Sequence, residues 1–442
     1  MANSYLTRTP SSTGNNQKFT ISCWLKRSGL GSQEIFTNAY NAQSDNGFLS
    51  ARFVNDNIEL TGWSTTWRVT NAKFRDTSAW YHVVIAIDTT LATAGDRIKI
   101  YVNGSQITSF STSNNPSQNH NFPFNTASFV QDVGCNNYGS GRTQFFNGYI
   151  SHYAQVDGSQ LTPTSFGETD STSGIWKFKS PSGITWGTNG VHLKFENSGA
   201  LGTDSSGQSN TYTVGGNLKQ ALDTPSNVYA TLNILTNDGG GAKTYSTGNT
   251  TVVESADNWT TAHSTLGVTT GKWYFEGKVT YSNNQEAYLG ACSQQTIQDR
   301  VTSSHYLGQT TGSVGYYTGN GSYYKGAGAV SYGSAVSGGD IVGVALDLDN
   351  NFIYFSINGT WQNSGDPTSG SSGTNGVALP SGMTSGDNIF LSVSPNQSTI
   401  QCNFGNGFFG TTAITSAGSN GNGSLFEYDV PSGYYALNTK NI

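Results

Sequence analysis

Two stretches decide the fold: "DRIKIYVNGSQIT" at residues 96–108 and "DNNFIYFSINGTWQN" at residues 349–363. Each places an Asn-Gly pair beside a run of alternating apolar side chains. Asn and Gly tolerate the positive φ angles of a type I′ turn, whose twist matches that of the flanking strands. In the second stretch Phe352 and Tyr354 should face one side of the strand, and the odd-numbered apolar residues the other. We therefore predict one β-hairpin of this kind in each half of the chain.

Short apolar or alternating runs fill the rest of the sequence, for example "KFTISCWLKR" at 18–27 and "KWYFEGKVTY" at 272–281. Gly, Asn and Ser clusters separate them, and no helix-period stretch of useful length occurs. The 442 residues are enough for two domains, and 55 Gly with only 11% charged residues is typical of turn-rich β structure. We predict an all-β protein with two antiparallel β-sandwich domains of the jelly-roll type in tandem.

An internal repeat marks the domain organisation. "DTPSNVYATLN" at 223–233 matches "DVPSGYYALN" at 429–438, and Asp-x-Pro-Ser forms a rigid turn. The second copy lies at the end of the sequence and should close a domain, and we expect the first copy to do likewise. The predicted organisation is a first domain at 1–222, a linker and closing segment at 223–248, and a second domain at 249–442.

Charge and terminal composition exclude several classes of partner. The net charge is −6 with no basic run, which argues against binding of nucleic acid or of an anionic membrane. The first residues lack the apolar stretch of a secretory signal, and no segment approaches membrane-spanning length. We expect a soluble protein, made in a cytoplasm and without membrane insertion.

The cysteines give no metal or redox motif. Cys23, Cys135, Cys292 and Cys402 lie far apart without a C-x-x-C pair. A buried thiol is the ordinary interpretation of Cys23 in its apolar strand, and one disulfide per half stays open.

Both halves resemble known modules. "FTISCWLKRSG", "WYHVVIAIDTT", "IKIYVNGSQI" and "FNGYISHYAQVDGSQLTPTSF" follow in the order seen in laminin-G-like, pentraxin-like domains. "GKWYFEGKV", "GSVGYYTGNGSYY" and "GDIVGVALDLDNNFIYFSINGTW" resemble a SPRY domain. The first resemblance implies a concanavalin A-type jelly roll and the second another β-sandwich. The joints, including "DTPSNVYATLN" and "YDVPSGYYALNTKNI", resemble those of virion proteins from tailed phages, especially phages of marine (cyanobacterial) hosts.

These resemblances imply a component of a virus particle. We expect a non-enzymatic virion surface protein, capsid- or tail-attached, that contacts other virion subunits and is present as a homo-oligomer or in many copies. It would be made in the host cytoplasm and reside on the virion surface. One alternative is a receptor-binding fibre or adhesin tip that recognises a host-surface glycan or protein. A polysaccharide-degrading enzyme is the alternative of another class.

The sequence offers weak candidates for catalysis. A retaining glycosidase needs two carboxylates about 5 Å apart, and Glu168 and Asp170 in "GETDSTSG" would share a strand face. Their Ser/Thr-rich surroundings favour a solvated turn instead. The six histidines are scattered, and a hydrogen-bonded structural role is the ordinary interpretation of His82 and His192. We assign no catalytic residue.

The resemblance of the first half to pentraxin-like domains implies calcium as a possible ligand, because those relatives bind it through loop carboxylates and amides. Asp132, Asn136 and Asn137 occupy the corresponding loop. Two of these three are amides, whereas calcium wants six or more oxygens, several of them charged. We expect no cofactor, with weak calcium binding at this loop as the open alternative.

Two aromatic stretches are candidate ligand-binding sites, since sugar recognition needs flat rings beside amides and hydroxyls. In "TGWSTTWRVT" the candidates are Trp63, Trp67 and Arg68, and in "GYYTGNGSYYKGAG" they are Tyr316, Tyr317, Tyr323 and Tyr324. The competing interpretation is packing or a subunit interface. One tyrosine of each adjacent pair should then lie in the core, and the second stretch would be a further hairpin.

Overall fold

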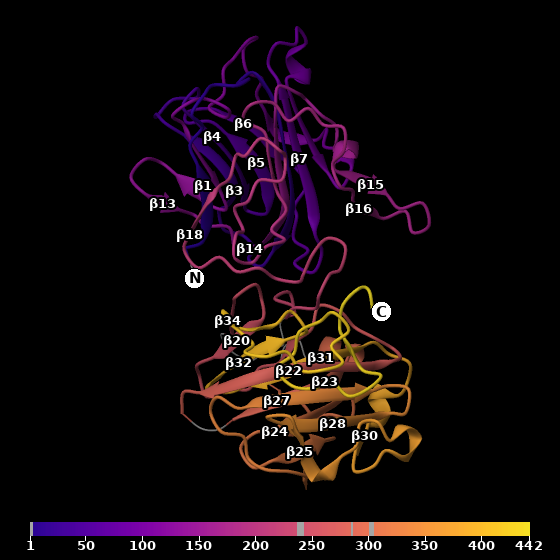
Figure 1. Cartoon of the computed structure of the whole chain (residues 1–442). Helices are drawn as coiled ribbons and strands as arrows, with labels where there is room; N and C mark the ends of the chain where they lie inside the picture. Colours follow the sequence, from indigo (N-terminus) through magenta and orange to yellow (C-terminus); the bar gives the residue numbers. More distant parts are fainter. Residues whose placement is uncertain (1–2, 237–242, 284–285, 300–304) are drawn as a thin grey trace. The chain divides into compact units, whose positions relative to one another are not determined.

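The computed structural model of the protein describes residues 3–236, 243–283, 286–299 and 305–442 (Figure 1). The chain forms two compact units, Met1–Gln220 and Ala221–Ile442. In each unit two antiparallel sheets pack face to face, so the prediction of an all-β protein with two β-sandwiches is confirmed. No helix in the described part of the chain is long and apolar enough to cross a membrane.

The first unit contains an eight-stranded and a six-stranded sheet. The eight-stranded sheet has the order β10 (Phe110–Ser113), β6 (Thr66–Thr70), β5 (Asn57–Thr61), β4 (Phe48–Val54), β3 (Glu34–Tyr40), β11 (Val130–Val133), β1 (Tyr5–Arg8) and β18 (Thr213–Gly215). The six-stranded sheet has the order β17 (Val191–Leu193), β14 (Gly148–Asp157), β2 (Lys18–Arg27), β7 (Tyr81–Asp88), β8 (Ile98–Val102) and β9 (Ser105–Gln106). Two short hairpins are β12 (Asn136–Asn137) with β13 (Arg142–Thr143), and β15 (Gly167–Thr169) with β16 (Trp176–Phe178).

The second unit repeats this plan with different strand lengths. The first of its two large sheets has the order β19 (Thr244–Ser246), β20 (Thr251–Glu254), β32 (Ser398–Asn403), β22 (Lys272–Tyr281), β27 (Ile341–Asp347), β28 (Phe352–Ile357) and β29 (Thr360–Trp361), with β30 (Val377–Ala378) on β28 and β35 (Tyr435–Ala436) on β22. The other has the order β21 (Ala262–His263), β31 (Ile389–Pro395), β23 (Ala287–Ser293), β24 (Ser313–Tyr317), β25 (Ser322–Lys325) and β26 (Gly328–Ser331). A small hairpin joins β33 (Phe408–Phe409) to β34 (Thr412–Ala413).

Helical structure in the described residues is limited to segments shorter than two turns. The described helices are α1 (Gln294–Asp299) and the 3₁₀ turns at Ala94–Asp96, Pro163–Ser165, Gln362–Ser364, Gly370–Ser372 and Ser381–Met383. The predicted lack of long helix-period stretches agrees with this result.

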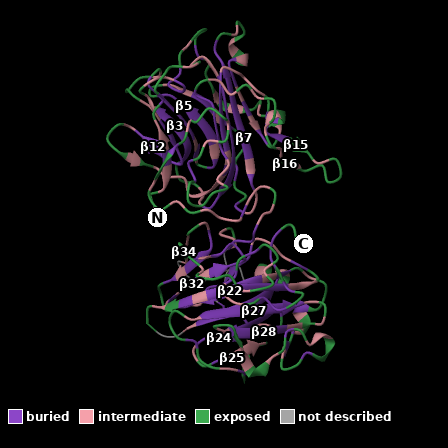
Figure 2. Cartoon of the chain, viewed as in Figure 1, coloured by how far each residue is buried: buried purple, intermediate pink, exposed green. Residues whose placement is uncertain are grey.

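The central strands of both sandwiches are largely buried along their length (Figure 2). Alternation divides their side chains between the core and the outer side of the sheet. In β28, Ile353 and Phe355 enter the main core of the second unit, whereas Tyr354 faces a separate cluster on the outer side of the sheet. In β2, Ile21 and Cys23 enter the core of the first unit and Trp24 points to the outer side. All four cysteines are buried and free, and the predicted burial of Cys23 is confirmed.

Both predicted Asn-Gly turns are present with the expected geometry. The φ angles are 47° and 82° at Asn103 and Gly104, and 47° and 78° at Asn358 and Gly359, as a type I′ turn requires. In each hairpin the Asn side chain also accepts a hydrogen bond from the neighbouring strand. His82 N donates to Asn103 Oδ1 over 2.8 Å, and Ile341 N donates to Asn358 Oδ1 over 2.9 Å.

An irregular segment covers the outer face of one sheet in each unit. In the first unit, residues 158–190, here called the strap, run between β14 and β17 and include the β15–β16 hairpin (Figure 1). The strap buries Phe166 against Val84, Ala154 and Val156. In the second unit, residues 404–442, here called the tail, bury Phe426, Val430 and Tyr434 against Tyr274, Ala345 and Tyr354.

The two copies of the internal repeat pair with each other, which corrects the expectation that the first copy closes the first domain. Ala230 N donates to Leu437 O over 2.9 Å, and Thr439 N donates to Val228 O over 3.0 Å. Ala230 also lies in the core of the second unit, fully buried. The physical reason is that an extended segment needs a partner for its backbone groups, and the matching copy near the end of the sequence provides it.

Candidate binding sites on the two sandwiches

Trp63 lies at the turn between β5 and β6, and its side chain is 39% exposed. It packs edge-on against Phe48 at 5.8 Å and against Tyr138 at 5.9 Å between ring centroids. Phe48 and Tyr138 stack on each other at 5.3 Å. These three rings, here called the Trp63 cluster, form a rigid apolar base that presents one indole to solvent.

Asp45 fixes the turn that carries Trp63. Its carboxylate accepts hydrogen bonds from the backbone N–H groups of Ser64 and Thr65 over 2.8 and 3.1 Å, and from their hydroxyls over 2.8 and 2.7 Å. Partial burial raises the pKa of Asp45, but the hydrogen bonds from Thr65 and Ser64 outweigh it and hold the pKa below its usual value. The charged carboxylate therefore holds the turn in one conformation at neutral pH.

Trp67 and Arg68, the other two candidates in this stretch, are buried, which corrects the prediction that they contact a ligand. Trp67 enters the core and packs on Phe122 at 5.6 Å. Arg68 is 2% exposed and donates to Asn115 Oδ1 over 2.8 Å and to the carbonyl of Asn114. Because β6 is only one strand from the sheet edge, the chain beyond β10 folds back over Arg68 and uses its donors.

The tyrosine stretch forms the predicted hairpin of β24 and β25, and its adjacent pairs divide between the two faces. Tyr316 is fully buried and donates to Ser334 O over 2.5 Å, so its assignment as a ligand contact is corrected. Tyr323 faces the same side and packs on Tyr332 at 5.7 Å. Tyr317 and Tyr324 point to the opposite, outer side of the sheet, as strand alternation requires.

On that outer side, five rings form what we call the tyrosine cluster: Trp259, Tyr288, Tyr306, Tyr317 and Tyr324. Tyr288 is its centre, with centroid distances of 4.9 Å to Tyr306 and to Tyr317, 5.0 Å to Trp259 and 5.3 Å to Tyr324. Tyr288 and Tyr317 are direct cross-strand partners on β23 and β24. Tyr288 is buried, whereas the other four rings are partly exposed.

Polar groups border the tyrosine cluster. The hydroxyl of Tyr317 donates to Glu286 Oε1 over 3.2 Å. Burial, with a further contribution from Glu286, raises the pKa of Tyr317 to about 12, so the phenol stays protonated and can donate at neutral pH. Partly exposed flat rings beside a carboxylate and phenol hydroxyls can stack on a sugar ring or pack against a protein surface.

Glu168 and Asp170, the carboxylates weighed for catalysis, share one lysine. Lys177 contacts both, at 3.6 Å from Glu168 Oε1 and 2.9 Å from Asp170 Oδ2. Asp170 also accepts hydrogen bonds from the backbone N–H groups of Ser173 and Thr172, over 2.9 and 3.0 Å. The backbone N–H of Ser173 and then Lys177 lower the pKa of Asp170, which caps the turn of the β15–β16 hairpin. The solvated turn is the interpretation that this geometry supports.

The loop considered for calcium holds an internal ion pair. Arg142 Nη2 lies 3.0 Å from Asp132 Oδ1 and donates to Thr7 Oγ1 over 2.8 Å. Asn136 Nδ2 donates to Gln144 Oε1 over 2.9 Å, and Asn137 Oδ1 accepts from Gly139 N over 2.9 Å. Within the described residues, no three or more His, Cys, Asp or Glu side chains gather around a metal position. A guanidinium beside the only carboxylate fits poorly with a second cation there.

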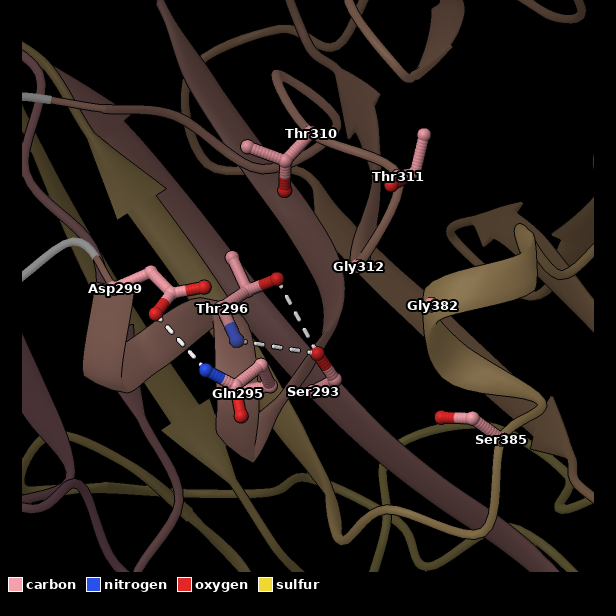
Figure 3. A pocket seen from close by; sticks show the side chains of 9 residues that line it. All are labelled: Ser293, Gln295, Thr296, Asp299, Thr310, Thr311, Gly312, Gly382 and Ser385. Atoms are coloured by element: carbon pink, nitrogen blue, oxygen red, sulfur yellow. Dashed lines mark hydrogen bonds between the residues drawn. The ribbon is translucent and has the colours of Figure 1, made fainter.

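The second unit also contains a polar cavity of about 460 Å³ (Figure 3). Its lining is Ser293, Gln295, Thr296, Asp299, Thr310, Thr311, Gly312, Gly382 and Ser385. Ser293 Oγ donates to Thr296 Oγ1 over 3.2 Å, and Gln295 Nε2 donates to Asp299 Oδ1 over 2.9 Å. The lining residues use part of their hydrogen-bonding capacity on one another, and none of those named is aromatic.

Comparison with known proteins identifies the two modules. Residues 1–164 match the laminin-G type of the concanavalin A-like lectin/glucanases superfamily, and residues 272–406 match the SPRY domain family. The chain therefore contains a laminin-G-type, concanavalin A-like domain followed by a SPRY domain. No curated protein matches the chain.

Solved structures of both kinds are similar to parts of the chain. The SPRY domain of human HERC1 is 14% identical over 37% of this chain and 94% of that chain, with a TM-score of 0.28. Another human SPRY domain is 17% identical over 37% and 96%, with a TM-score of 0.27. The heptameric SAP-like pentraxin from Limulus polyphemus is 18% identical over 36% and 71%, with a TM-score of 0.29.

Proposed function

We propose that the protein is a non-enzymatic binding component of a tailed-phage particle, located on the virion surface and present there in many copies. Its two sandwiches contact neighbouring capsid or tail subunits. The virion setting rests on the resemblance of the joint segments at 223–233 and 428–442 to those of phage virion proteins. Both module types usually serve as binding modules, although fold alone does not fix function.

The observation that carries the binding role is the tyrosine cluster. Four partly exposed rings lie around buried Tyr288, on the outer face of the second sheet. Aromatic side chains packed on a rigid base lose little conformational freedom on binding and are enriched where proteins make their strongest contacts. A sheet face with the partly exposed rings of Tyr317 and Tyr324 can therefore bind a protein surface of complementary shape.

Purified particles test the setting and the role together. We expect mass spectrometry to find the chain in multiple copies per virion and imaging to place it over capsid or tail subunits. Tyr324→Ala should lower its occupancy on particles at least tenfold, because the truncation removes a contact ring. Val330→Ala, which shortens an exposed side chain on neighbouring β26, is the matched control and should keep normal occupancy. Absence of the chain from all particles would overturn the proposal.

A second candidate function, recognition of a host-surface glycan, is favoured by the Trp63 cluster. One indole is 39% exposed, and the Asp45-bound turn beside it carries the Ser64 and Thr65 hydroxyls. Binding of the purified protein to host surface polysaccharide, measured by titration calorimetry, should disappear in Trp63→Ala and persist in Val214→Ala, a similarly exposed apolar residue. Equal binding by both variants would argue against a sugar site here.

A further inference from the structure

Three histidines that are scattered in the sequence meet three aromatic rings of the strap. His82 on β7 stacks on Trp176 at 5.9 Å and 15°, and His192 on β17 stacks on Trp186 at 5.6 Å and 15°. His152 stacks on Phe178 at 3.6 Å and 12°. The histidines belong to the six-stranded sheet of the first unit and the rings to the strap, so each pair joins the cover to the sheet.

The polar contact between the β15–β16 hairpin and the sheet runs through His82. Trp176 Nε1 donates to His82 Nδ1 over 2.9 Å, while the other described hydrogen bonds of residues 163–178 stay within the strap. An indole N–H can only donate, so Nδ1 must carry a lone pair. The proton then sits on Nε2, which lies 2.8 Å from Ser22 Oγ. The structure therefore requires the neutral imidazole.

A protonated His82 would place an N–H at Nδ1 facing the N–H of Trp176. The two donors repel, and the imidazole, which is fully buried between Trp24 and Trp176, has no free acceptor in this geometry. Burial lowers the pKa of His82 to about 3. A proton can therefore bind readily only after Trp176 has left.

The charged side chains on the elements that pack against His82 contact other partners and not the imidazole. On β8, Lys99 pairs with Asp96 at 3.2 Å, and on the hairpin Lys177 pairs with Asp170 at 2.9 Å and contacts Glu168. On β2, Lys26 lies over the ring of Tyr149.

The other two histidines respond in the same direction. Burial lowers the pKa of His152 and of His192 to about 4 each, with Lys194 acting on both and Asp204 opposing it at His192. Nδ1 of His152 and Nε2 of His192 are buried and have no hydrogen-bond partner. His152 is also the bulged residue of β14, with a φ of 46°. Protonation of any of the three histidines is therefore disfavoured while the strap is closed.

We propose that the strap is a pH-sensitive cover, which opens locally in mild acid because His82 binds a proton once Trp176 has left and the protonated imidazole no longer accepts the indole N–H. Opening uncovers Trp24, Val84, Ala154 and Val156 on the outer face of the sheet. The ends of the strap stay attached, because β14 and β17 are paired and Leu161 N donates to Thr20 Oγ1 over 2.7 Å. The inference does not depend on which ligand the protein binds.

Hydrogen exchange of the full-length protein tests this, with intrinsic rates corrected for pH. Between pH 6.5 and pH 5.0 the opening constant of residues 163–178 should rise about 16-fold, because the histidine of the open strap is already half protonated at its ordinary pKa of 6.5. Amides of β7 and of β22 in the second unit, which exchange only through global unfolding, should stay much more slowly exchanging than those of the strap at both pH values, because the opening is local. Strap amides that exchange as slowly as those of β7 at pH 5.0, or no rise in the strap, would overturn the proposal.

Two variants assign the effect to the His82–Trp176 contact. His82→Gln keeps an acceptor for the indole but cannot titrate, so most of the rise in the opening constant should disappear. Trp176→Phe keeps a stacked ring without the N–H donor, so the strap should open more easily at pH 7.5 and depend less on pH. If His82→Gln does not fold, Trp176→Phe alone decides. The wild-type pH slope in either folded variant would refute the role of this contact.

Discussion

The covers of the two sandwiches can be compared residue by residue. In the first unit, Trp176 of the strap lies on Gly104 of the Asn-Gly turn, where an added Cβ would come within 2.5 Å of its ring. In the second unit, Tyr428 of the tail lies on Gly359 of the corresponding turn, where a Cβ would come within 2.6 Å. The same hairpin thus supplies the same feature twice: a bare glycine on which a covering aromatic ring rests.

The polar groups that hold the two covers differ. The strap hydrogen-bonds to a neutral imidazole, His82. The tail hydrogen-bonds to a buried carboxylate: Glu276 accepts from the backbone N–H groups of Glu427 and Tyr428 over 2.9 Å each, and from Asn403 Nδ2 over 3.2 Å. Burial raises the pKa of Glu276 to about 7, although these donors act against it.

Because a histidine holds the strap and a glutamate holds the tail, the stability of the two covers should change in opposite directions as the pH falls. A histidine whose pKa is lower in the folded state contributes stability above its ordinary pKa of 6.5 and loses it as the pH falls. A glutamate whose pKa is raised contributes more stability near pH 4.5 and less above pH 7. Acid should therefore loosen the strap and leave the tail in place.

Removal of the Glu276 carboxylate should produce the largest effect. Glu276→Ala leaves the N–H groups of Glu427 and Tyr428 and the amide of Asn403 buried without their acceptor. We expect the free energy of unfolding of the second unit to fall by about 3–5 kcal/mol, since each unsatisfied buried donor costs about 1–3 kcal/mol. Urea denaturation with hydrogen exchange of the tail measures the loss.

Glu427→Gln provides the control for this substitution. Its partly exposed carboxylate binds the hydroxyl and N–H of Thr415 instead of the sheet, so we expect a change below about 0.5 kcal/mol. A loss of similar size in both variants would show that Glu276 is not the anchor of the tail.

The two units should also differ in how much stability they lose in acid. Each contains one buried glutamate whose pKa is raised by burial to about 7, Glu34 and Glu276, and these contributions cancel in the comparison. In the second unit, burial lowers the pKa of His263 far below its usual value, and His305 is buried as well. The first unit has His82, His152 and His192 in this class.

From pH 6.5 to pH 5.0 each fully buried neutral histidine should cost about 1.6 kcal/mol, because half of the unfolded-state imidazole is already protonated at pH 6.5. The first unit should therefore lose at least about 1.6 kcal/mol more free energy of unfolding than the second, even if only His82 and His192 contribute fully. The comparison is made in the His305→Gln variant, because His305 of the second unit is also buried. Global hydrogen exchange of core amides in the two units, measured at both pH values, tests this. An equal loss in both units would contradict the assignment.

The sequence was sufficient to predict the parts of the molecule that depend on local chemistry. Both Asn-Gly turns, the strands at 18–27 and 272–281 and the alternation of Tyr316 and Tyr317 follow from rules that act within a few residues. The covers could not be predicted in this way. His82 and Trp176 are separated by almost a hundred positions, and nothing in "SGIWKFKS" shows that its indole donates to a strand histidine.

The candidate sites show the same limit. Trp63 and Trp67 both fit an aromatic, Thr-rich stretch, but the one at the turn is exposed and the one in the strand is buried. The tyrosine cluster takes Trp259, Tyr288 and Tyr306 from three segments that offered no common pattern. The pairing of β23 with β24 sets Tyr288 opposite Tyr317, and Trp259 and Tyr306 reach Tyr288 from two loops.

The smallest expected effect tests the shared feature of the two hairpins. Gly104→Ala and Gly359→Ala should each cost about 1–2 kcal/mol, because alanine is strained at positive φ and its methyl group displaces a ring. Gly158→Ala and Gly339→Ala are matched controls, since their φ angles are 94° and 97° and nothing lies near the added Cβ. The excess over the control should appear as faster hydrogen exchange of the strap for Gly104→Ala and of the tail for Gly359→Ala. If each turn variant costs no more than its control, the rings merely lie near the glycines and their contact does not stabilise the covers.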